Sequence, residues 1–179
     1  MAELNLVESP RSKTTYAGLL VRIVENDNVI WEEFKNVAPE LADIGRERFD
    51  RSGLVLVGTL RKNGYPRISP VEPLFADGHL YLGMMWNSKK AQDLLRDPRC
   101  TVHNTVANRD GSEGEYKVYG RAVPVLDLEQ RTRYCNAVYV KSGWKPTEPE
   151  FHVFSVDIES VGVVAFSDED MITRVWTPD

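Results

Sequence analysis

The segment LVLVGTLRKNGYPRISPVEPLFADGHLYLGMM, residues 54–85, decides the fold class. It contains apolar runs separated by Asn63-Gly64 and Asp77-Gly78, the dipeptides typical of tight β-hairpin turns. The predicted strands are Leu54–Leu60, Arg67–Phe75 and His79–Met85. Strands joined by such turns predict an antiparallel meander.

Prolines at positions 66, 70 and 73 lie in or directly before the middle strand of this meander. Proline lacks the N–H that a central strand donates to its neighbour, so it is found at sheet edges and bulges. We therefore expect this strand to be bulged or to lie partly at an edge.

Further elements follow on both sides of this segment. The predicted strands are Cys100–Val106, Tyr116–Val125, one or two within Phe151–Phe166, and Met171–Trp176. The first predicted helical region is Trp31–Phe49, which Pro39 splits in two and Gly53 ends. The second helix is Ser88–Asp97. The third begins at an Asp127 cap, with Gln130 in the capping-box position, and runs to about Tyr139. Residues 16–24 fit a strand or a helix. Six or seven strands with few helices predict a mainly β fold with flanking α, a closed or nearly closed antiparallel barrel.

The composition is that of a globular domain. The 179 residues are 42% apolar and 27% charged, and the net charge of −5 argues against non-specific nucleic-acid binding. The apolar stretch Ala17–Val21 is far shorter than a membrane span. Cys100 and Cys135 fit no disulfide framework, which favours packed thiols in a reduced, cytoplasmic protein. We expect a domain over residues 30–179, preceded by an arm over residues 1–29 whose order the sequence leaves open.

The helix start Asn87-Ser88-Lys89-Lys90 is the strongest candidate site. A helix N-terminus is already positive, so two lysines in its first turn are unfavourable unless an anion is present. A phosphate would accept bonds from backbone N–H groups, the Ser88 hydroxyl and both ammonium groups. The alternative is a serine cap followed by two solvated lysines.

Other candidates are less specific. Arg67 and Ser69 share one face of their strand, where they line either a polar groove or a solvated surface. Trp86 lies two residues before the candidate anion site. The three histidines lack metal-ligand spacing, which predicts no metal site, and no nucleotide-binding loop or catalytic motif occurs.

The run GTLRKNGYPRISPVEPLFADGHLYLGMMWNSKKAQDLLRDPRCTVH, with the later YKVYGRAVPV, resembles the pyridoxamine 5′-phosphate oxidase-like superfamily of flavin-binding split barrels. The resemblance spans roughly residues 55–125. It implies a six-stranded antiparallel split β-barrel of the FMN-binding type, working as a homodimer with cofactors in grooves between the chains.

The resemblance also implies site residues. Ser88, Lys89 and Lys90 match the phosphate-binding positions of the family. The positions along the cofactor's ribityl chain and ring are matched by Ser69, Pro70, Val71, Glu72, Gly83 and Met84, and Glu115 matches a contact from the other chain. We add Arg67 and Trp86 as neighbours of these positions. No protein side chain is expected to act as a catalytic nucleophile.

The chain departs from the vitamin B6 oxidases themselves. Those carry an arginine where this chain has Ser69, and an Arg-x-His segment after a tryptophan, whereas this chain ends in ITRVWTPD. The resemblance therefore implies an FMN-dependent oxidoreductase with hydride transfer to or from an unidentified small molecule, rather than vitamin B6 oxidation. Alternatives are an F420-dependent reductase, with Arg61, Lys62 and Arg67 facing the acidic cofactor tail, and a flavin- or haem-binding protein without turnover.

Overall fold

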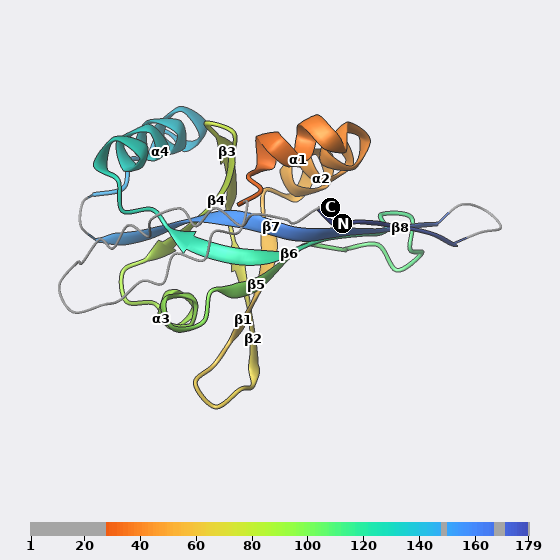
Figure 1. Ribbon diagram of the computed structural model, residues 1–179, viewed down its shortest axis with the longest axis horizontal. Coiled ribbons are helices and arrows are strands. Elements are labelled where there is room, and N and C mark those ends of the chain that lie inside the picture. Colours follow the sequence, from red (N-terminus) through yellow and green to blue (C-terminus); the bar gives the residue numbers. More distant parts are fainter. Residues whose placement is uncertain (1–27, 148–149, 167–170, 179) are drawn as a thin grey trace, which may run out of the picture.

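A computed structural model of the chain describes residues 28–147, 150–166 and 171–178. The strands form one antiparallel sheet in the order β2-β1-β5-β6-β7-β4-β3, and β8 pairs with the end of β7 (Figure 1). They are β1 (Val55–Leu60), β2 (Pro66–Val71), β3 (Pro73–Ala76), β4 (His79–Met85), β5 (Arg99–Asn104), β6 (Glu115–Pro124), β7 (Phe151–Phe166) and β8 (Met171–Trp176).

The sheet closes on itself through a bend at Glu72. Strands β2 and β3 stand at opposite ends of the strand order, yet only Glu72 separates them in the sequence. Within the described residues β2 pairs with β1 and β3 pairs with β4. Pro73 begins β3, where the missing N–H is tolerated. Counted as one bent strand, β2 and β3 complete the six strands of the predicted split barrel, and β8 is an addition to it.

The two predicted hairpin turns differ in length. Ala76 pairs with His79, so Asp77-Gly78 forms a two-residue turn with φ of 49° and 76°, as a type I′ turn requires. Asn63-Gly64 instead lies in a longer loop, because Leu60 pairs with Pro66. The Arg61 N–H donates to the Tyr65 carbonyl at 2.9 Å across this loop.

The described helices are α1 (Trp31–Val37), α2 (Pro39–Ser52), α3 (Lys89–Arg96) and α4 (Leu128–Ser142). Among these four, α3 and α4 begin where the Ser88 and Asp127 caps predict. Gly53 and Gly143 end α2 and α4 in the left-handed region, so α4 extends past the predicted end near Tyr139. Figure 1 shows α1, α2 and α4 on one side of β7 and α3 on the other.

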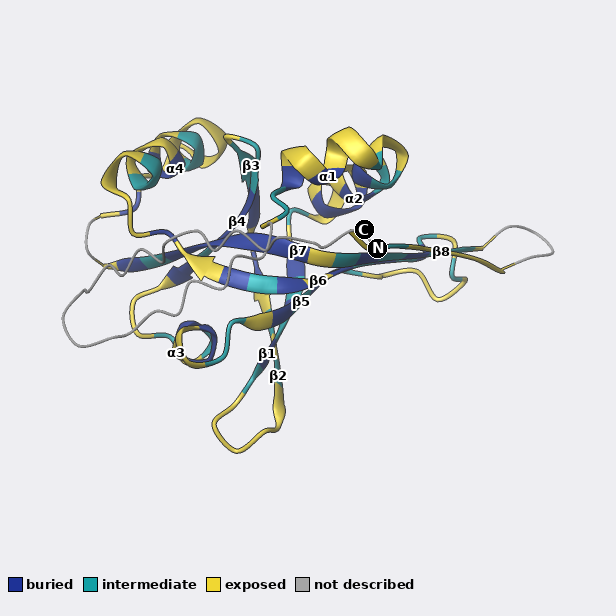
Figure 2. Ribbon diagram, viewed as in Figure 1, coloured by how far each residue is buried: buried dark blue, intermediate teal, exposed yellow. Residues whose placement is uncertain are grey.

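The core lies between the curled sheet and α1 and α2, where the buried residues concentrate (Figure 2). Its largest fully buried side chains include Phe34, Phe49 and Phe154. Cys100 and Cys135 are buried and form no disulfide, and burial raises the pKa of Cys100 to about 12, as expected of packed thiols. The undecided segment 16–24 lies outside the described residues. None of the described helices is long and apolar enough to cross a membrane.

Candidate functional site

The start of α3 presents two lysines without a neighbouring acid in the first turn. Ser88 is the N-cap, and its hydroxyl accepts a hydrogen bond from the Ala91 N–H at 3.4 Å. The Lys90 ammonium donates to the Pro70 carbonyl at 3.1 Å, and burial lowers its pKa. Lys90 thus connects the helix start directly to β2.

The turn that precedes α3 is held from the opposite side by β7. Asn87 has a φ of 54°, and its N–H donates to His152 Nε2 at 3.3 Å. The Trp86 indole stacks on the His152 ring with centroids 4.4 Å apart and an interplanar angle of 11°. Burial, with a smaller contribution from Arg131, lowers the pKa of His152, which favours the neutral ring that can accept this bond.

A buried carboxylate ties α3 to the first hairpin. Asp93 is 4% exposed and accepts hydrogen bonds from Arg67 Nε at 2.6 Å, Thr59 Oγ1 at 3.1 Å and Arg96 Nη2 at 3.2 Å. Burial acts to raise the pKa of Asp93, but these bonds outweigh it and hold the pKa below the ordinary value. The Arg67 guanidinium is therefore paired with Asp93 rather than free, and the side chain lines the groove described next.

An open groove of about 910 Å³ lies beside this network. Its lining is strongly basic: Arg61, Lys62, Asn63, Arg67, Asn87, Lys89, Gln92, Asp93 and Arg96. Asp93 is the one carboxylate among these residues. We call this space the basic groove.

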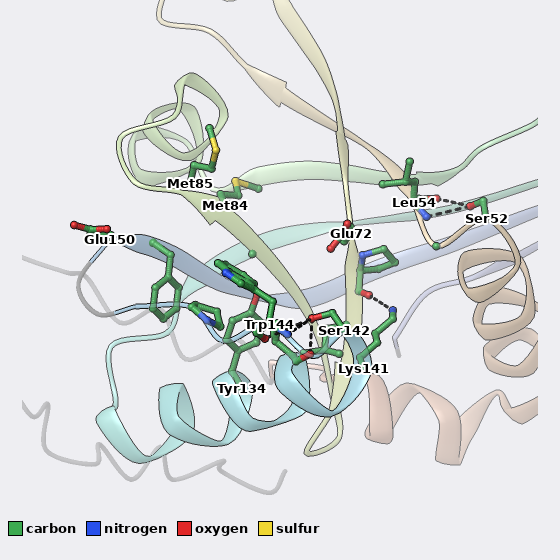
Figure 3. A pocket seen from close by; sticks show the side chains of 17 residues that line it. Ser52, Leu54, Glu72, Met84, Met85, Tyr134, Lys141, Ser142, Trp144 and Glu150 are labelled. Atoms are coloured by element: carbon green, nitrogen blue, oxygen red, sulfur yellow. Dashed lines mark hydrogen bonds between the residues drawn. The ribbon is translucent and has the colours of Figure 1, made fainter.

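A second space of about 640 Å³ lies between α4 and the strands and is mainly apolar (Figure 3). Its lining residues are Ser52, Gly53, Leu54, Glu72, Pro73, Leu74, Gly83, Met84, Met85, Tyr134, Val138, Lys141, Ser142, Trp144, Pro146, Glu150 and Phe151. We call this space the apolar cavity. The Lys141 ammonium donates to the Pro73 carbonyl at 3.0 Å, so one of its donors is already engaged.

The groove and the cavity are neighbours. Met85 lines the cavity and Asn87 lines the groove, so the two spaces are two residues apart on the chain, about 7 Å at full extension. On β2, Pro70 binds Lys90, and Glu72 lines the cavity two residues later. The structure therefore brings a cationic helix start and an apolar space together.

Some of the predicted site residues line these two spaces. Arg67 and Lys89 line the basic groove, whereas Glu72, Gly83 and Met84 line the apolar cavity. The remaining predicted residues line neither space. They lie on β2, in the turn before α3 and at the start of that helix, with Val71 packed in the core: Ser69, Pro70, Val71, Trp86, Ser88 and Lys90. Glu115 lies apart, at the start of β6, where it is paired with Lys117 of the same chain.

The sequence reasoning missed the contribution of α4. Tyr134, Val138 and Lys141 all line the cavity from this helix. Their spacing of four and three residues places them on one helix face, which is a signal that the sequence carried. Trp144 and Phe151 add aromatic walls from the segment after α4 and the start of β7.

Comparison with known proteins identifies the family of the chain. A sequence model of the family described as pyridoxamine 5′-phosphate oxidase matches residues 42–165. The chain belongs to the pyridoxamine 5′-phosphate oxidase family. No curated protein matches the sequence.

Solved structures with the fold of this pyridoxamine 5′-phosphate oxidase-like chain are distant in sequence. A NimC/NimA family protein from Clostridium acetobutylicum is 15% identical, with a TM-score of 0.62, covering 80% of this chain and 97% of its own. A protein related to general stress protein 26, from the same organism, is 18% identical, with a TM-score of 0.54. The match covers 80% of this chain and 94% of that protein. A haem-binding protein from Mycobacterium smegmatis is 18% identical, with a TM-score of 0.56. The match covers 73% of this chain and only 57% of the length of that protein. These likenesses establish the split-barrel fold.

Proposed function

We propose that the protein is an FMN-dependent oxidoreductase that works as a homodimer on an unidentified small molecule. The observation that carries the proposal is that the basic groove, the start of α3 and the apolar cavity are neighbours. An elongated ligand with an anionic end and a planar, largely apolar ring matches this arrangement. Membership of the pyridoxamine 5′-phosphate oxidase family supports a flavin as that ligand.

The residues at the start of α3 would hold the phosphate of the flavin. Lys89 and Lys90 would neutralise it, and the Ser88 hydroxyl and backbone N–H groups would complete the site. Because the Lys90 ammonium already reaches Pro70 on β2, it lies between the helix and the predicted ribityl contacts Ser69–Val71. Charge neutralisation at this helix start would relieve the unfavourable placement of the two lysines.

The strand side of the apolar cavity would hold the ring. Glu72, Gly83 and Met84 are predicted ring neighbours and line the cavity there, whereas Tyr134 and Trp144 line the opposite side, where the molecule that reacts with the ring would lie (Figure 3). The bound flavin would supply hydride transfer at ring N5. The protein side chains would orient the ring, exclude water from it and select the molecule that reacts with it.

The homodimer part of the proposal rests on exposed apolar groups next to the site. Ile68 on β2 is 71% exposed, Met85 at the end of β4 is 78% exposed, and Trp86 is 52% exposed. A second chain covering these side chains would close the site, and its Glu115 would then reach the ring. Light scattering should give twice the 20.3 kDa mass of the chain, and a monomer at working concentration would contradict this part.

The basic groove favours one second candidate, an F420-dependent reductase. Arg61 and Lys62 extend the positive lining beyond the helix start, farther than a single phosphate requires. An acidic cofactor tail would match this extension. Replacing both residues with alanine would then weaken F420 binding and leave FMN binding unchanged.

The decisive experiment is a fluorescence titration of the purified protein with FMN, F420 and riboflavin. Replacing both Lys89 and Lys90 with alanine should weaken FMN binding at least about ten-fold, because each lost charged hydrogen bond costs about 1.5–3 kcal/mol. Riboflavin lacks the phosphate, so its affinity should not change. Lys35→Ala, on the exposed face of α1, is the matched control.

Each result of this titration has a distinct meaning. Unchanged FMN affinity in the double variant would refute the phosphate assignment. Tight F420 binding with weak FMN binding would keep hydride chemistry but replace the cofactor. Cofactor binding without turnover across donors and acceptors would favour a binding protein, and if neither flavin binds, haem is the next ligand to test.

A further inference from the structure

The Tyr134 hydroxyl makes no hydrogen bond to another residue in the part of the chain that the structure describes, and it opens onto the apolar cavity. The side chain is 7% exposed, but its oxygen is not among the fully buried, unsatisfied atoms of the described residues. Its ring packs at 5.6 Å from Tyr81 and 6.1 Å from Phe151. An unengaged hydroxyl on a side chain that is otherwise packed among aromatic rings calls for an explanation.

The position of Tyr134 gives that explanation, because the hydroxyl lies at a cavity. Tyr134 rises from α4 toward the strands that carry Glu72 and Met84 (Figure 3). A side chain on Gly83 would bring its Cβ within 2.0 Å of the Tyr134 oxygen, so only glycine leaves room for the hydroxyl there. The Tyr116 hydroxyl, which is fully buried and makes no hydrogen bond within the described residues, is instead packed against Gly45 of α2 and lines neither the apolar cavity nor the basic groove.

The protonation state makes Tyr134 a donor. Burial is the main reason that the pKa of Tyr134 rises to about 12, and the charge of Glu72 contributes in the same direction. The phenol therefore keeps its proton throughout the physiological pH range. A ligand that satisfies it must offer a hydrogen-bond acceptor.

The other polar groups of the cavity restrict the charge of that ligand. Glu72 and Glu150 are carboxylates, and the ammonium of Lys141 is already bound to the Pro73 carbonyl. An anionic ligand would meet two like charges and one engaged cation. The aromatic walls of Trp144 and Phe151 favour a planar ring.

We propose that the apolar cavity binds an uncharged, planar substrate with a carbonyl-type acceptor, and that Tyr134 donates the hydrogen bond that recognises this acceptor. This inference deepens the proposed function, since it names the substrate class of the same site. The flavin ring also carries carbonyl groups, so the experiment must distinguish a substrate acceptor from a cofactor acceptor.

The test uses Tyr134→Phe, which removes the hydroxyl alone, and two probes of the same ring. The probes are 2-acetylnaphthalene, a neutral ketone, and 2-naphthoate, its anionic counterpart. Their affinities are measured by ligand-observed NMR titration with the protein both free of flavin and saturated with FMN. Tyr139→Phe is the matched control, because Tyr139 is on the same helix, 57% exposed and not among the cavity lining.

The wild-type protein should bind the ketone more tightly than the carboxylate. Tyr134→Phe should weaken ketone binding at least about five-fold, since it leaves the acceptor buried and unpaired. Tyr139→Phe should change nothing, and the melting temperature should not fall in either variant. FMN affinity should be the same in Tyr134→Phe and wild type.

Two results would overturn the proposal. Equal ketone affinity in wild type and Tyr134→Phe would show that Tyr134 donates no hydrogen bond to the ketone. A loss of FMN affinity alone would assign the hydroxyl to the cofactor ring. The measurement in flavin-free protein separates this inference from the proposed function, because a failure of FMN to bind would leave the ketone comparison intact.

Discussion

The basic groove and the apolar cavity differ in how their buried polar groups are satisfied. In the groove, Asp93 receives three donors from its own chain. In the cavity, the Tyr134 hydroxyl receives none within the described residues. A network that is complete without a ligand stabilises the fold and positions the helix start. A hydroxyl that opens onto a cavity without a hydrogen bond to the chain is available to a ligand.

The largest effect expected from this difference is at Asp93. Replacing Asp93 with alanine leaves Arg67 and Arg96 without their counter-ion and should lower the free energy of unfolding by about 2–3 kcal/mol. Because both arginine side chains reach solvent, we expect a loss of stability at the lower end of the range that is typical of broken buried ion pairs. Urea denaturation measures it, with Asp50→Ala as control, because the exposed Asp50–Arg46 pair should contribute little. Equal losses of stability in the two variants would contradict the claim that the Asp93 network contributes more than an exposed ion pair.

The same carboxylate should make stability depend on acid. The pKa of Asp93 is lowered in the folded state, so its contribution is complete above the ordinary value of 3.8 and is lost as the pH falls through the folded value. Asp93→Asn should therefore flatten the dependence of unfolding free energy on pH below about pH 4. A variant that keeps the wild-type acid slope would show that other carboxylates set it.

A smaller loss is expected at Gly83, on the cavity side. In Gly83→Ala the new methyl group would overlap the Tyr134 oxygen, and displacing the packed ring should cost about 1–3 kcal/mol. In a Tyr134→Phe background the nearest remaining ring atom is 3.2 Å away, so the same substitution should cost less. A double-mutant cycle measures the coupling, and additive losses would argue against this contact.

Much of the fold could be predicted because its signals are local. Asp77-Gly78 specifies a two-residue turn by the left-handed conformation that both residues adopt. The prolines of the second strand indicated an irregular edge, and the structure makes them the place where the barrel closes. They did not show that the bend falls at Glu72, because that depends on which neighbours each half of the strand pairs with.

The candidate site was less predictable because it depends on contacts between distant segments. The cap and lysines of α3 are local, and the helix starts where Ser88 indicated. The pairing of Arg67 with Asp93 joins residues far apart in the sequence. The spacing of residues on the strand therefore could not decide whether Arg67 lines a groove or a solvated face. Likewise, the helical spacing of Tyr134 and Val138 predicts a shared face, but only the tertiary packing shows that this face meets β4.

The smallest effects are expected from removing single hydroxyls, and they separate two tyrosines that touch each other. Tyr81 is fully buried, and its hydroxyl accepts a hydrogen bond from Gln130 Nε2 at 2.9 Å. Tyr81→Phe should therefore lower the free energy of unfolding by about 0.5–1.5 kcal/mol. Tyr134→Phe removes a hydroxyl that has no such bond, so it should leave stability unchanged or raise it slightly. Thermal and urea unfolding of both variants in ligand-free protein measure the contrast, since the rings and their packing at 5.6 Å are retained. If Tyr134→Phe destabilised the protein as much as Tyr81→Phe, the Tyr134 hydroxyl would already be satisfied within the chain, and the cavity would hold no donor reserved for a ligand.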